Sequence, residues 1–509
     1  MKCRMFSFLG LCAVMLSVVL MTSIPVSAQV GGGGGGGAGG GGGGGGDPGD
    51  GGGGGGDGGG DGNDNGQDPG DQFVGQGLSG IDIDALGVLR TKKIKADNAR
   101  LTRDRINAAK AKMNKDLAQP SKLRKISLNR LEAAIAKNLR EGKKIGDDML
   151  YLAGLTRVTH VFFYPETNDI VIAGPAEGFF ADANGKMVGM ETRKVILQLQ
   201  DLVVALRAFP PSGKKTKMLS VSIDPTQEGL KNFKKVVTQV HRQLQAQGGI
   251  TKNQEVQVAN TFKKALGNQT VTIQGVSPQS HFAQVLVEAD YRMKLIGIGL
   301  ERTPVKITTF VDKVSPTGLA KNALQRWYFE PNYECVQVNA DETGMQLIGN
   351  GVKLVGENER VAGNGERTKT GRDSAASRAF TRSFTKKYND MADKHPVYGE
   401  LRNLMDLSIV AAFIQEMDFY GKAGWKMDLL GNEKNLRVEY FRTPKQVEPA
   451  INAFWKGRTF MTPIGGGVSI QPRVALSDDN LKQDEKGQVD SVKNSIRVDG
   501  LEEGQWWWD

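Results

Sequence analysis

The sequence is poor in the two residue types that build most disulfides and metal sites. It has three cysteines and four histidines in 509 residues. Cys3 and Cys12 fall within the first 28 residues, which are expected to be removed as a signal peptide. Cys335 then stands alone, and no disulfide is expected within the mature chain. The histidines are not spaced like a metal-ligand set, and each is expected to be structural: His160, His241, His281 and His395.

Motifs of the common enzyme classes are also missing. The sequence has no G-x-S-x-G, no H-E-x-x-H, no phosphate-binding G-x-x-x-x-G-K-[ST], no paired C-x-x-C, and no G-x-G-x-x-G after an expected strand. After the first 28 residues, no apolar run approaches the roughly 20 residues that a membrane-spanning helix needs. We therefore expect no membrane anchor in the mature chain.

The N-terminus has the pattern of a secretory signal peptide over residues 1–28. Lys2 and Arg4 make its start positive, residues 6–21 are apolar, and Val26-Ser27-Ala28 is a small-residue cleavage site. The mature protein is expected to be exported to the periplasm, the cell envelope or the extracellular space.

A Gly/Asp-rich leader is expected over residues 29–89. Residues 31–62 contain 26 glycines, and such a segment has too little apolar surface to offset the backbone entropy lost on folding, so it should be disordered. Asp61, Asn63 and Asn65 occupy the first positions of a calcium-loop pattern, but Pro69 and Gln72 break it where later ligands should stand. Calcium is therefore a weak candidate ligand, and a solvated linker is the simpler interpretation.

Charge is distributed unevenly along the chain. The formal net charge is +10, but residues 29–89 carry nine acidic side chains and no Lys or Arg, whereas residues 90–144 carry 18 basic and five acidic side chains. The basic region, residues 90–150, is expected to form helices over residues 97–118 and 127–141, the second capped by Ser127. These helices could simply be solvated. Alternatively, they bind an anionic polymer or envelope surface through Arg124, Lys125, Arg130, Lys137, Arg140, Lys143 and Lys144.

Four junctions share one local pattern, in which a β-branched run is followed by a capping residue, a proline and a helical stripe. The expected strands are residues 218–223, 270–276, 305–314 and 436–441, and the junctions are Asp224-Pro225, Ser277-Pro278, Ser315-Pro316 and Thr443-Pro444. Ser, Thr and Asp cap helix N-termini, and proline is favoured at the first helical position. The pattern predicts an α/β fold with a mixed sheet and right-handed crossovers, mainly over residues 151–356.

The remaining segments complete the expected domain organisation. Hairpins are expected over residues 156–173 and 344–355, and a polar loop over residues 357–373. Residues 374–475 should hold a helical pair, with Phe380, Phe384 and Tyr388 in the core, and a final β-α unit. Residues 476–509 are expected to be a polar, disordered tail.

One group of residues is a candidate active site. If strands 218–223 and 270–276 are parallel neighbours, their carboxyl ends bring Asp224, Ser277 and His281 together beside two helix N-termini, where open α/β sheets bind ligands. The competing interpretation is that Asp224 and Ser277 only cap helices.

Four stretches resemble a known family. ALRAFPPSG (205–213), SIDPTQEGL (222–230), ADYRMKLIGIGLE (289–301) and RWYFEPNYE (326–334), behind a signal peptide and a low-complexity leader, are similar to planctomycete secreted proteins built on a domain of unknown function. The resemblance covers about residues 195–420. It implies export and supplies no catalytic residue.

Three functions remain open on the sequence. The first is an exported, non-enzymatic protein that is structural or associated with the envelope. The second is an exported hydrolase acting through Asp224, Ser277 and His281. The third is a module that binds a carbohydrate or a polyanion.

Overall fold

A computed structural model describes residues 80–92, 98–213, 216–246, 251–315, 323–452, 454–455, 459–460 and 464–509. All of them belong to one compact unit, residues 64–509. The predicted signal peptide, most of the leader and the calcium-loop residues Asp61, Asn63 and Asn65 lie outside the described residues. Among the residues that are described, no helix combines the length and apolar composition needed to cross a membrane.

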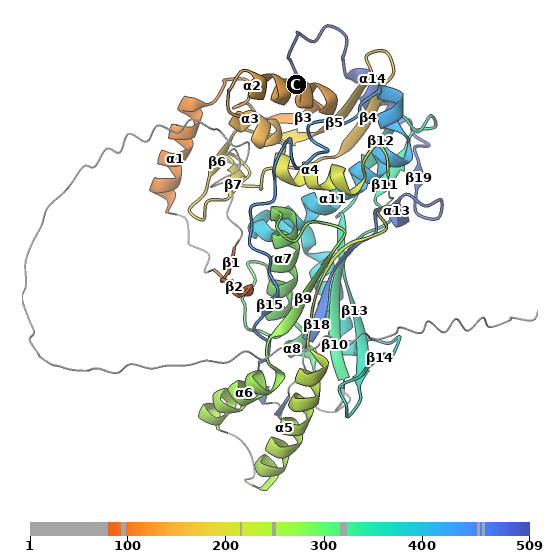
Figure 1. Cartoon of the computed structure of the whole chain (residues 1–509). Helices are drawn as coiled ribbons and strands as arrows, with labels where there is room; N and C mark the ends of the chain where they lie inside the picture. The colour runs from red at the N-terminus through yellow and green to blue at the C-terminus, as the bar shows by residue number, and fades with distance from the viewer. Residues whose placement is uncertain are drawn as a thin grey trace, which may run out of the picture. The chain divides into compact units, whose positions relative to one another are not determined.

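The described residues form two large sheets (Figure 1). The larger has nine strands, in the order β1 (Ile81–Ile83), β2 (Val88–Thr91), β15 (Gln446–Val447), β9 (Gln269–Gln274), β8 (Leu219–Asp224), β18 (Ile464–Ile470), β10 (Ala323–Pro331), β13 (Val352–Val361) and β14 (Arg367–Lys369). Two of its pairs, β10 with β18 and β15 with β2, are parallel. The sheet is therefore mixed, as predicted.

The second sheet has seven strands, in the order β19 (Lys482–Gln483), β11 (Val336–Val338), β12 (Gly344–Leu347), β4 (His160–Tyr164), β5 (Asp169–Ala176), β3 (Ser121–Ser127) and β20 (Trp507–Trp508). Two small ribbons pair β6 (Phe179–Ala181) with β7 (Met187–Gly189), and β16 (Phe454–Trp455) with β17 (Thr459–Phe460). β4 and β5 form the hairpin predicted over residues 156–173, although β4 begins at His160, and the turn residues Pro165 to Asn168 suit its short loop.

Helices fill the space around and between the sheets. They are α1 (Ala99–Lys112), α2 (Leu128–Arg140), α3 (Asp147–Leu150), the 3₁₀ turn η2 (Leu152–Gly154), α4 (Leu199–Ala208), α5 (Gln227–Ala246), α6 (Lys252–Leu266), α7 (His281–Gly297), α8 (Phe310–Lys313), α9 (Ala375–Lys386), α10 (Tyr388–Lys394), α11 (Pro396–Glu416), α12 (Phe419–Ala423), α13 (Pro472–Ala475) and α14 (Gln488–Ser495). α7 packs on β8 and β18, and α11 packs on α7 and α4.

The two central helices, α7 and α11, are buried on all sides. Every residue from Val397 to Ile414 is buried, and in α7 only Leu295 is not. Helices buried all round are normally apolar, yet these carry charged residues. The charges are neutralised locally, for example by the i, i+4 pairs of α7, Asp290 with Lys294 and Glu288 with Arg292.

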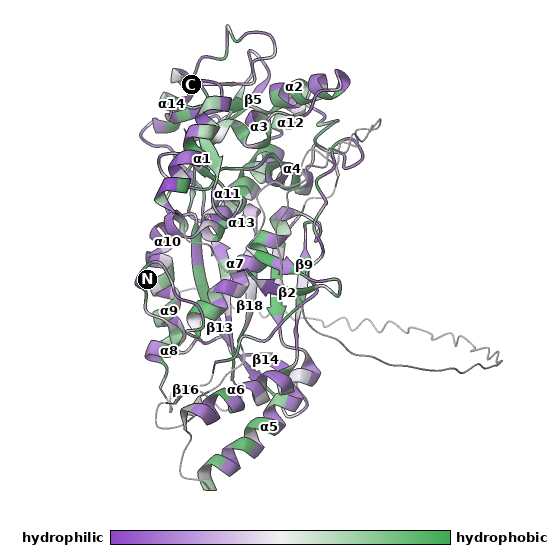
Figure 2. Cartoon of the chain, turned by 90° about the vertical axis from the view of Figure 1, so that its left-hand side faces the viewer, coloured by the Kyte–Doolittle hydropathy of each residue, from purple (hydrophilic) through white to green (hydrophobic). Residues whose placement is uncertain are grey.

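The two helices α5 and α6 form a hairpin that extends away from the sheets in both views (Figures 1 and 2). Apolar and hydrophilic residues alternate along both helices in Figure 2. The apolar stripe near the base of the hairpin, which includes Leu230, Phe233, Phe262 and Leu266, packs against Leu324 of β10 and other residues of the body. The predicted α5 stripe is thereby confirmed.

Several other predictions are confirmed by the packing. α1 and α2 lie within the expected ranges, and the Ser127 Oγ accepts a hydrogen bond from the amide of Arg130 at 3.4 Å. Phe380, Phe384 and Tyr388 are fully buried, and their rings pack against one another and against Tyr398. Cys335 packs as a small buried residue, and burial, with the Asp406 carboxylate, raises the pKa of its thiol to about 12.

The four predicted junctions are only partly right. Helices follow two of them, but Thr226 caps α5 and Ser280 caps α7, where their hydroxyl oxygens accept from Gly229 and Ala283 amides at 2.9 and 3.2 Å. Residues 305–314 contain the short helix α8 instead of a strand. Of the helical stripe expected after Ser315-Pro316, the described residues, from Ala323 on, form the strand β10. Residues 436–441 form no strand, and β15 follows Pro444 in place of a helix.

The expected connections differ as well. β8 and β9 are neighbours but antiparallel, because the α5–α6 hairpin returns the chain to the end of the sheet from which it left. The expected hairpin over residues 344–355 is wrong because β12 and β13 belong to different sheets. The expected polar loop over residues 357–373 contains the end of β13 and its antiparallel partner β14.

The two segments predicted to be disordered, residues 29–89 and 476–509, both contain folded structure. The expected leader ends before residue 89, since β1 and β2 pair and bury Ile81 and Leu89. The C-terminal segment is folded: α14 buries Val489, and Trp506 and Trp508 are 4% and 8% exposed. The segment is polar on average, but burial of these few large apolar side chains is enough to attach it to the second sheet.

Candidate functional site

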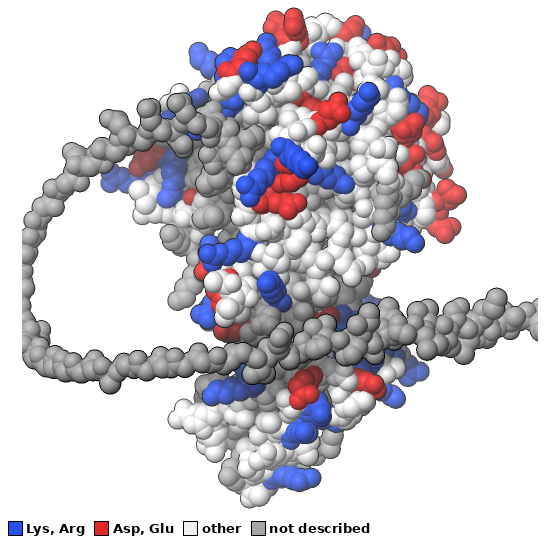
Figure 3. Space-filling view, viewed as in Figure 1, with Lys and Arg blue, Asp and Glu red and all other residues white. Residues whose placement is uncertain are grey.

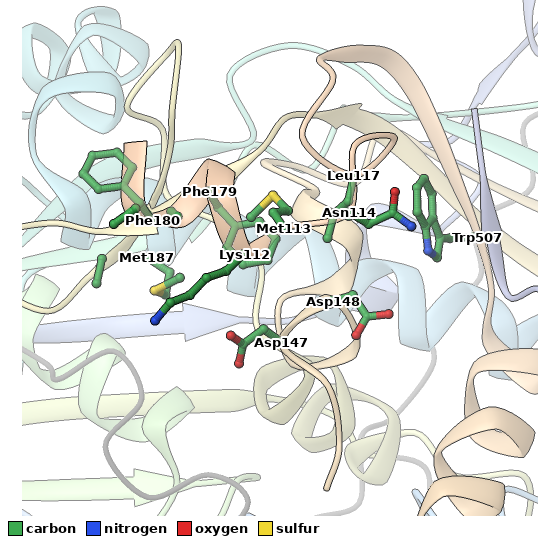
Figure 4. Close-up of a pocket in the computed structure, with 13 residues that line it drawn as sticks. Lys112, Met113, Asn114, Leu117, Asp147, Asp148, Phe179, Phe180, Met187 and Trp507 are labelled. Carbon is green, nitrogen blue, oxygen red and sulfur yellow. The ribbon is translucent and has the colours of Figure 1, made fainter. Parts of the chain in front are cut away.

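A groove of about 530 Å³ lies between α1, α3, the β6–β7 ribbon and the C-terminal strand β20 (Figure 4). A volume of this size suits a small molecule or a few units of a polymer. The lining combines aromatic, thioether and charged side chains, and those labelled in Figure 4 are Lys112, Met113, Asn114, Leu117, Asp147, Asp148, Phe179, Phe180, Met187 and Trp507.

The β6–β7 ribbon and β20 supply the aromatic side chains. Phe179 and Phe180 are almost fully buried, and the ring of Phe179 packs on Tyr151 with centroids 5.2 Å apart. Trp507 is partly exposed and lies at the opposite end of the groove from Phe180 in Figure 4. The groove therefore has an apolar floor and one partly open aromatic face.

A buried arginine holds Trp507 in place. The guanidinium of Arg124 lies 4.7 Å from the centroid of a Trp507 ring and donates to both carboxylate oxygens of Asp509. It also donates to backbone carbonyls, including those of Leu117 and Ala153. Arg124 is fully buried, so it is no longer a candidate for a polyanion surface.

The polar side chains of the groove come from α1 and α3. Lys112 and Asp147 are exposed, and Lys112 reaches across the groove between Met187 and Asp147 in Figure 4. Burial, and to a smaller extent the neighbouring Asp147, raise the pKa of Asp148. Neither aspartate forms an ion pair with a described residue, so both can accept hydrogen bonds from a ligand.

The predicted active-site residues are not brought together. Asp224 lies in a closed ring of ion pairs: Arg326 bridges it to Glu359, and Arg367 bridges Glu359 back to it, with N–O distances between 2.6 and 3.4 Å. The ring lies over β18, where a Cβ at Gly465 would be 2.5 Å from a carboxylate oxygen of Asp224. Asp224 is thus an ion-pair partner and caps no helix.

His281 is instead paired with Asp201 of α4, 3.0 Å from its Nδ1. Burial alone would lower the pKa of His281, but the Asp201 carboxylate outweighs burial and raises it. Ser277 lies outside this pair, beside a separate hollow of about 300 Å³, where its Oγ accepts from the amide of Gln279. Among the described residues, no hydrogen bond joins the Ser277 hydroxyl to His281, so the structure shows no nucleophile–base pair of a hydrolase there.

The remaining cations of the basic region are divided. Arg130 pairs with the buried Asp169, and burial lowers the pKa of Lys125. Four cations at and just after the end of α2 are exposed: Lys137, Arg140, Lys143 and Lys144. In Figure 3, basic side chains, with some acidic ones among them, lie over the part of the surface that α2 occupies in Figure 1. Within the described residues, no group of three or more His, Cys, Asp or Glu could hold a metal ion.

Sequence reasoning missed the groove because its parts are far apart in the chain. Trp507 is nearly 400 residues from Lys112, and neither side chain belongs to a motif. The run Trp506-Trp507-Trp508 was the one available signal, because three adjacent tryptophans are unusual in a segment taken to be a polar tail.

Comparison with known proteins adds one finding. A family model described as "Protein of unknown function (DUF1598)" matches residues 221–310, from β8 to the start of α8. Two of the four stretches that carry the family resemblance, residues 222–230 and 289–301, fall within the match, and the groove does not. No curated protein and no solved structure matches the chain.

Proposed function

We propose that this protein is a non-enzymatic binding protein and that its groove holds a carbohydrate chain. The observation that carries the proposal is a partly open indole, that of Trp507, in one groove with two carboxylates, those of Asp147 and Asp148. Neither carboxylate forms an ion pair within the described part of the chain. Sugar rings present C–H faces that pack on aromatic rings, and hydroxyl groups that donate to carboxylates.

The charges of the groove favour a neutral chain over a polyanion. The groove is lined by two acidic side chains, Asp147 and Asp148, and one basic side chain, Lys112. An anionic polymer would therefore be repelled there. The exposed cations of α2 are a separate surface, at which an anionic polymer or envelope component could bind. We also propose, on the signal-peptide pattern of residues 1–28, that the protein works outside the cytoplasm.

The test is binding of neutral hexasaccharides of glucose and of N-acetylglucosamine, measured by titration calorimetry. Trp507→Ala and Asp148→Asn should each weaken binding about tenfold, equivalent to about 1.4 kcal/mol. Tyr440→Ala is the matched control, because its ring also lies against a guanidinium, that of Arg437 at 5.1 Å, but outside the groove.

Circular dichroism and thermal unfolding of each variant separate loss of binding from loss of fold. The proposal is wrong if neither hexasaccharide binds the wild-type protein at millimolar concentration. It is also wrong if Trp507→Ala binds as tightly as Tyr440→Ala.

A further inference from the structure

The β6–β7 ribbon, which carries Phe179, Phe180 and Met187 of the groove, pairs with neither large sheet. Its turn is stabilised locally, since a carboxylate oxygen of Asp182 accepts from the amides of Asn184 and Lys186, both at 2.8 Å. A two-stranded ribbon of three residues a side is marginal by itself. Contacts with the body must therefore hold this wall of the groove in position.

One of those contacts is a buried ion pair at the end of the turn. The side chain of Lys186 enters the body, and its Nζ lies 2.7 Å from both carboxylate oxygens of Glu400 on α11. The two side chains are 6% and 7% exposed. A buried charge is tolerated only when it is paired, so each partner fixes the other in place.

A second carboxylate links this pair to the start of the described chain. Glu400 and Glu288 lie on α11 and α7, which pack on each other, and Glu301 bridges Arg292 of α7 to His395 at the start of α11, at 3.0 and 3.6 Å. Burial would lower the pKa of Lys186, but Glu400 and then Glu288 raise it. Glu288 accepts from the amide of Gly80 at 2.6 Å and pairs with Arg292, which donates to the carbonyls of Gly80 and Lys92. The charges of Asp201 and His281 also interact with this pair, Asp201 with Lys186 and His281 with both Lys186 and Glu400.

We propose that Lys186 is a positioning residue of the groove, and that the charges around it couple the β6–β7 wall to the β1–β2 hairpin, where the N-terminal segment enters the body. The proposal rests on the proposed function for the meaning of the groove. Displacing Gly80 would remove one of the two donors to Glu288 among the described residues, leaving only Arg292, and would disturb the charges that hold Lys186.

The first experiment is hydrogen exchange of the full mature chain carrying Lys186→Met. Amides of residues 179–189 should exchange at least tenfold faster, while those of β4 and β5 keep their protection. Lys194→Met is the matched control, because Lys194 lies just after the same ribbon and pairs with Asp393 at the surface, where both side chains are about 40% exposed. Glu400→Gln replaces Lys186→Met if that variant does not fold.

The second experiment tests the coupling with Glu288→Gln, which changes no residue of the ribbon. Exchange should rise about threefold both in residues 80–92 and in residues 179–189. A rise in residues 80–92 alone would refute the coupling, and unchanged exchange of the ribbon in Lys186→Met would refute the positioning role. Hydrogen exchange needs no ligand, so failure of the hexasaccharides to bind would reject the proposed function without deciding this result.

Binding gives the remaining readout. Lys186→Met should lower the affinity for the hexasaccharide about tenfold relative to the wild type, although Lys186 does not line the groove. Lys194→Met should bind as the wild type does. Equal affinity of the two variants would contradict the role of Lys186 in positioning the site.

Discussion

His160 in the centre of the second sheet is a buried histidine whose neutral form the fold requires. Burial lowers its pKa to about 4, its Nδ1 lies 2.9 Å from the hydroxyl of Thr159, and its ring stacks on Phe162. The unfolded chain should titrate near the ordinary value of 6.5. Between these values the unfolded state binds more protons, so stability is lost as the pH falls from about 6.5 to about 4.

We predict that His160→Gln removes this part of the pH dependence. The wild type should lose about 3 kcal/mol more than the variant between pH 7 and pH 4. Urea unfolding at a series of pH values measures the difference between the two proteins. Parallel stability profiles would show that His160 is accessible to protons in the folded state.

At the same scale, Asp224 shows why a capping pattern can mislead. The sequence Asp-Pro-Thr-Gln offers two capping side chains, and the fold uses Thr226 because Asp224 is the last residue of β8 and faces Arg326 and Arg367. Sequence spacing alone cannot distinguish the two, since the arginines come from strands more than 100 residues away.

Among the elements, β18 depends on its three consecutive glycines. A Cβ at Gly467 would overlap the backbone carbonyl oxygen of Val221 on β8, and one at Gly466 would overlap that of Trp327 on β10. Because the obstacles are backbone atoms of paired strands, no side-chain rotation can relieve the overlap.

We predict that Gly467→Ala lowers the free energy of unfolding by more than about 3 kcal/mol. Gly363→Ala is the control, since a Cβ there meets no atom within 4 Å and Gly363 lies in the turn between β13 and β14. Chemical denaturation of both variants gives the comparison. Two variants of equal stability would mean that β8 and β18 can separate at no cost.

The C-terminal strand β20 is the element on which the groove and the edge of the second sheet both depend. Trp507 and Trp508 pair with Ile126 and Lys125 of β3, and the side chain of Asp509 neutralises Arg124. We predict that removing residues 506–509 lowers the free energy of unfolding by at least about 3–5 kcal/mol, the usual cost of losing one buried tryptophan.

Asp509→Asn is the graded control for that truncation, because it weakens the pairing of Arg124 and keeps the strand. It should cost clearly less in the same thermal or chemical unfolding experiment. A truncated chain as stable as the full one would restore the interpretation of residues 476–509 as a disordered tail.

At the scale of the whole molecule, the separation of charge along the sequence remains the main electrostatic feature. The basic region keeps an exposed cluster at the end of α2, although Arg124 and Arg130 are used internally. The acidic leader is part of the same chain, and a tethered segment is expected to have a high effective concentration near such a cluster. An external polyanion and the leader would compete for these cations.

We predict that deleting residues 29–72 makes the protein elute from a heparin column at higher salt. Lys143→Ala combined with Lys144→Ala should reverse the effect, and binding should weaken as salt rises because each cation releases a counterion. Unchanged elution after the deletion would show that the leader does not screen the cluster. Failure of both proteins to bind at low salt would leave the α2 cations as a solvated surface.

Much of the fold could be predicted from local pattern alone. The amphipathic stripes of α2, α5 and α9 and the turn between β4 and β5 depend on residues within a few positions of one another, and these elements were found. The mixed α/β class followed from them. The burial of Cys335 could be predicted as well, because an isolated cysteine most often packs as a small apolar residue.

The tertiary structure alone decided which strands pair and where the groove lies. The sequence predicts a helix in the region of β10 because Leu319, Ala323 and Trp327 form a helical stripe, yet pairing of β10 with β13 and β18 outweighs this weak local preference. The groove joins Lys112, Asp148, Phe180 and Trp507, side chains from four separate elements that only packing brings together. Local sequence fixes elements because their energies are local, whereas a site formed across elements depends on long-range pairing that no single segment encodes.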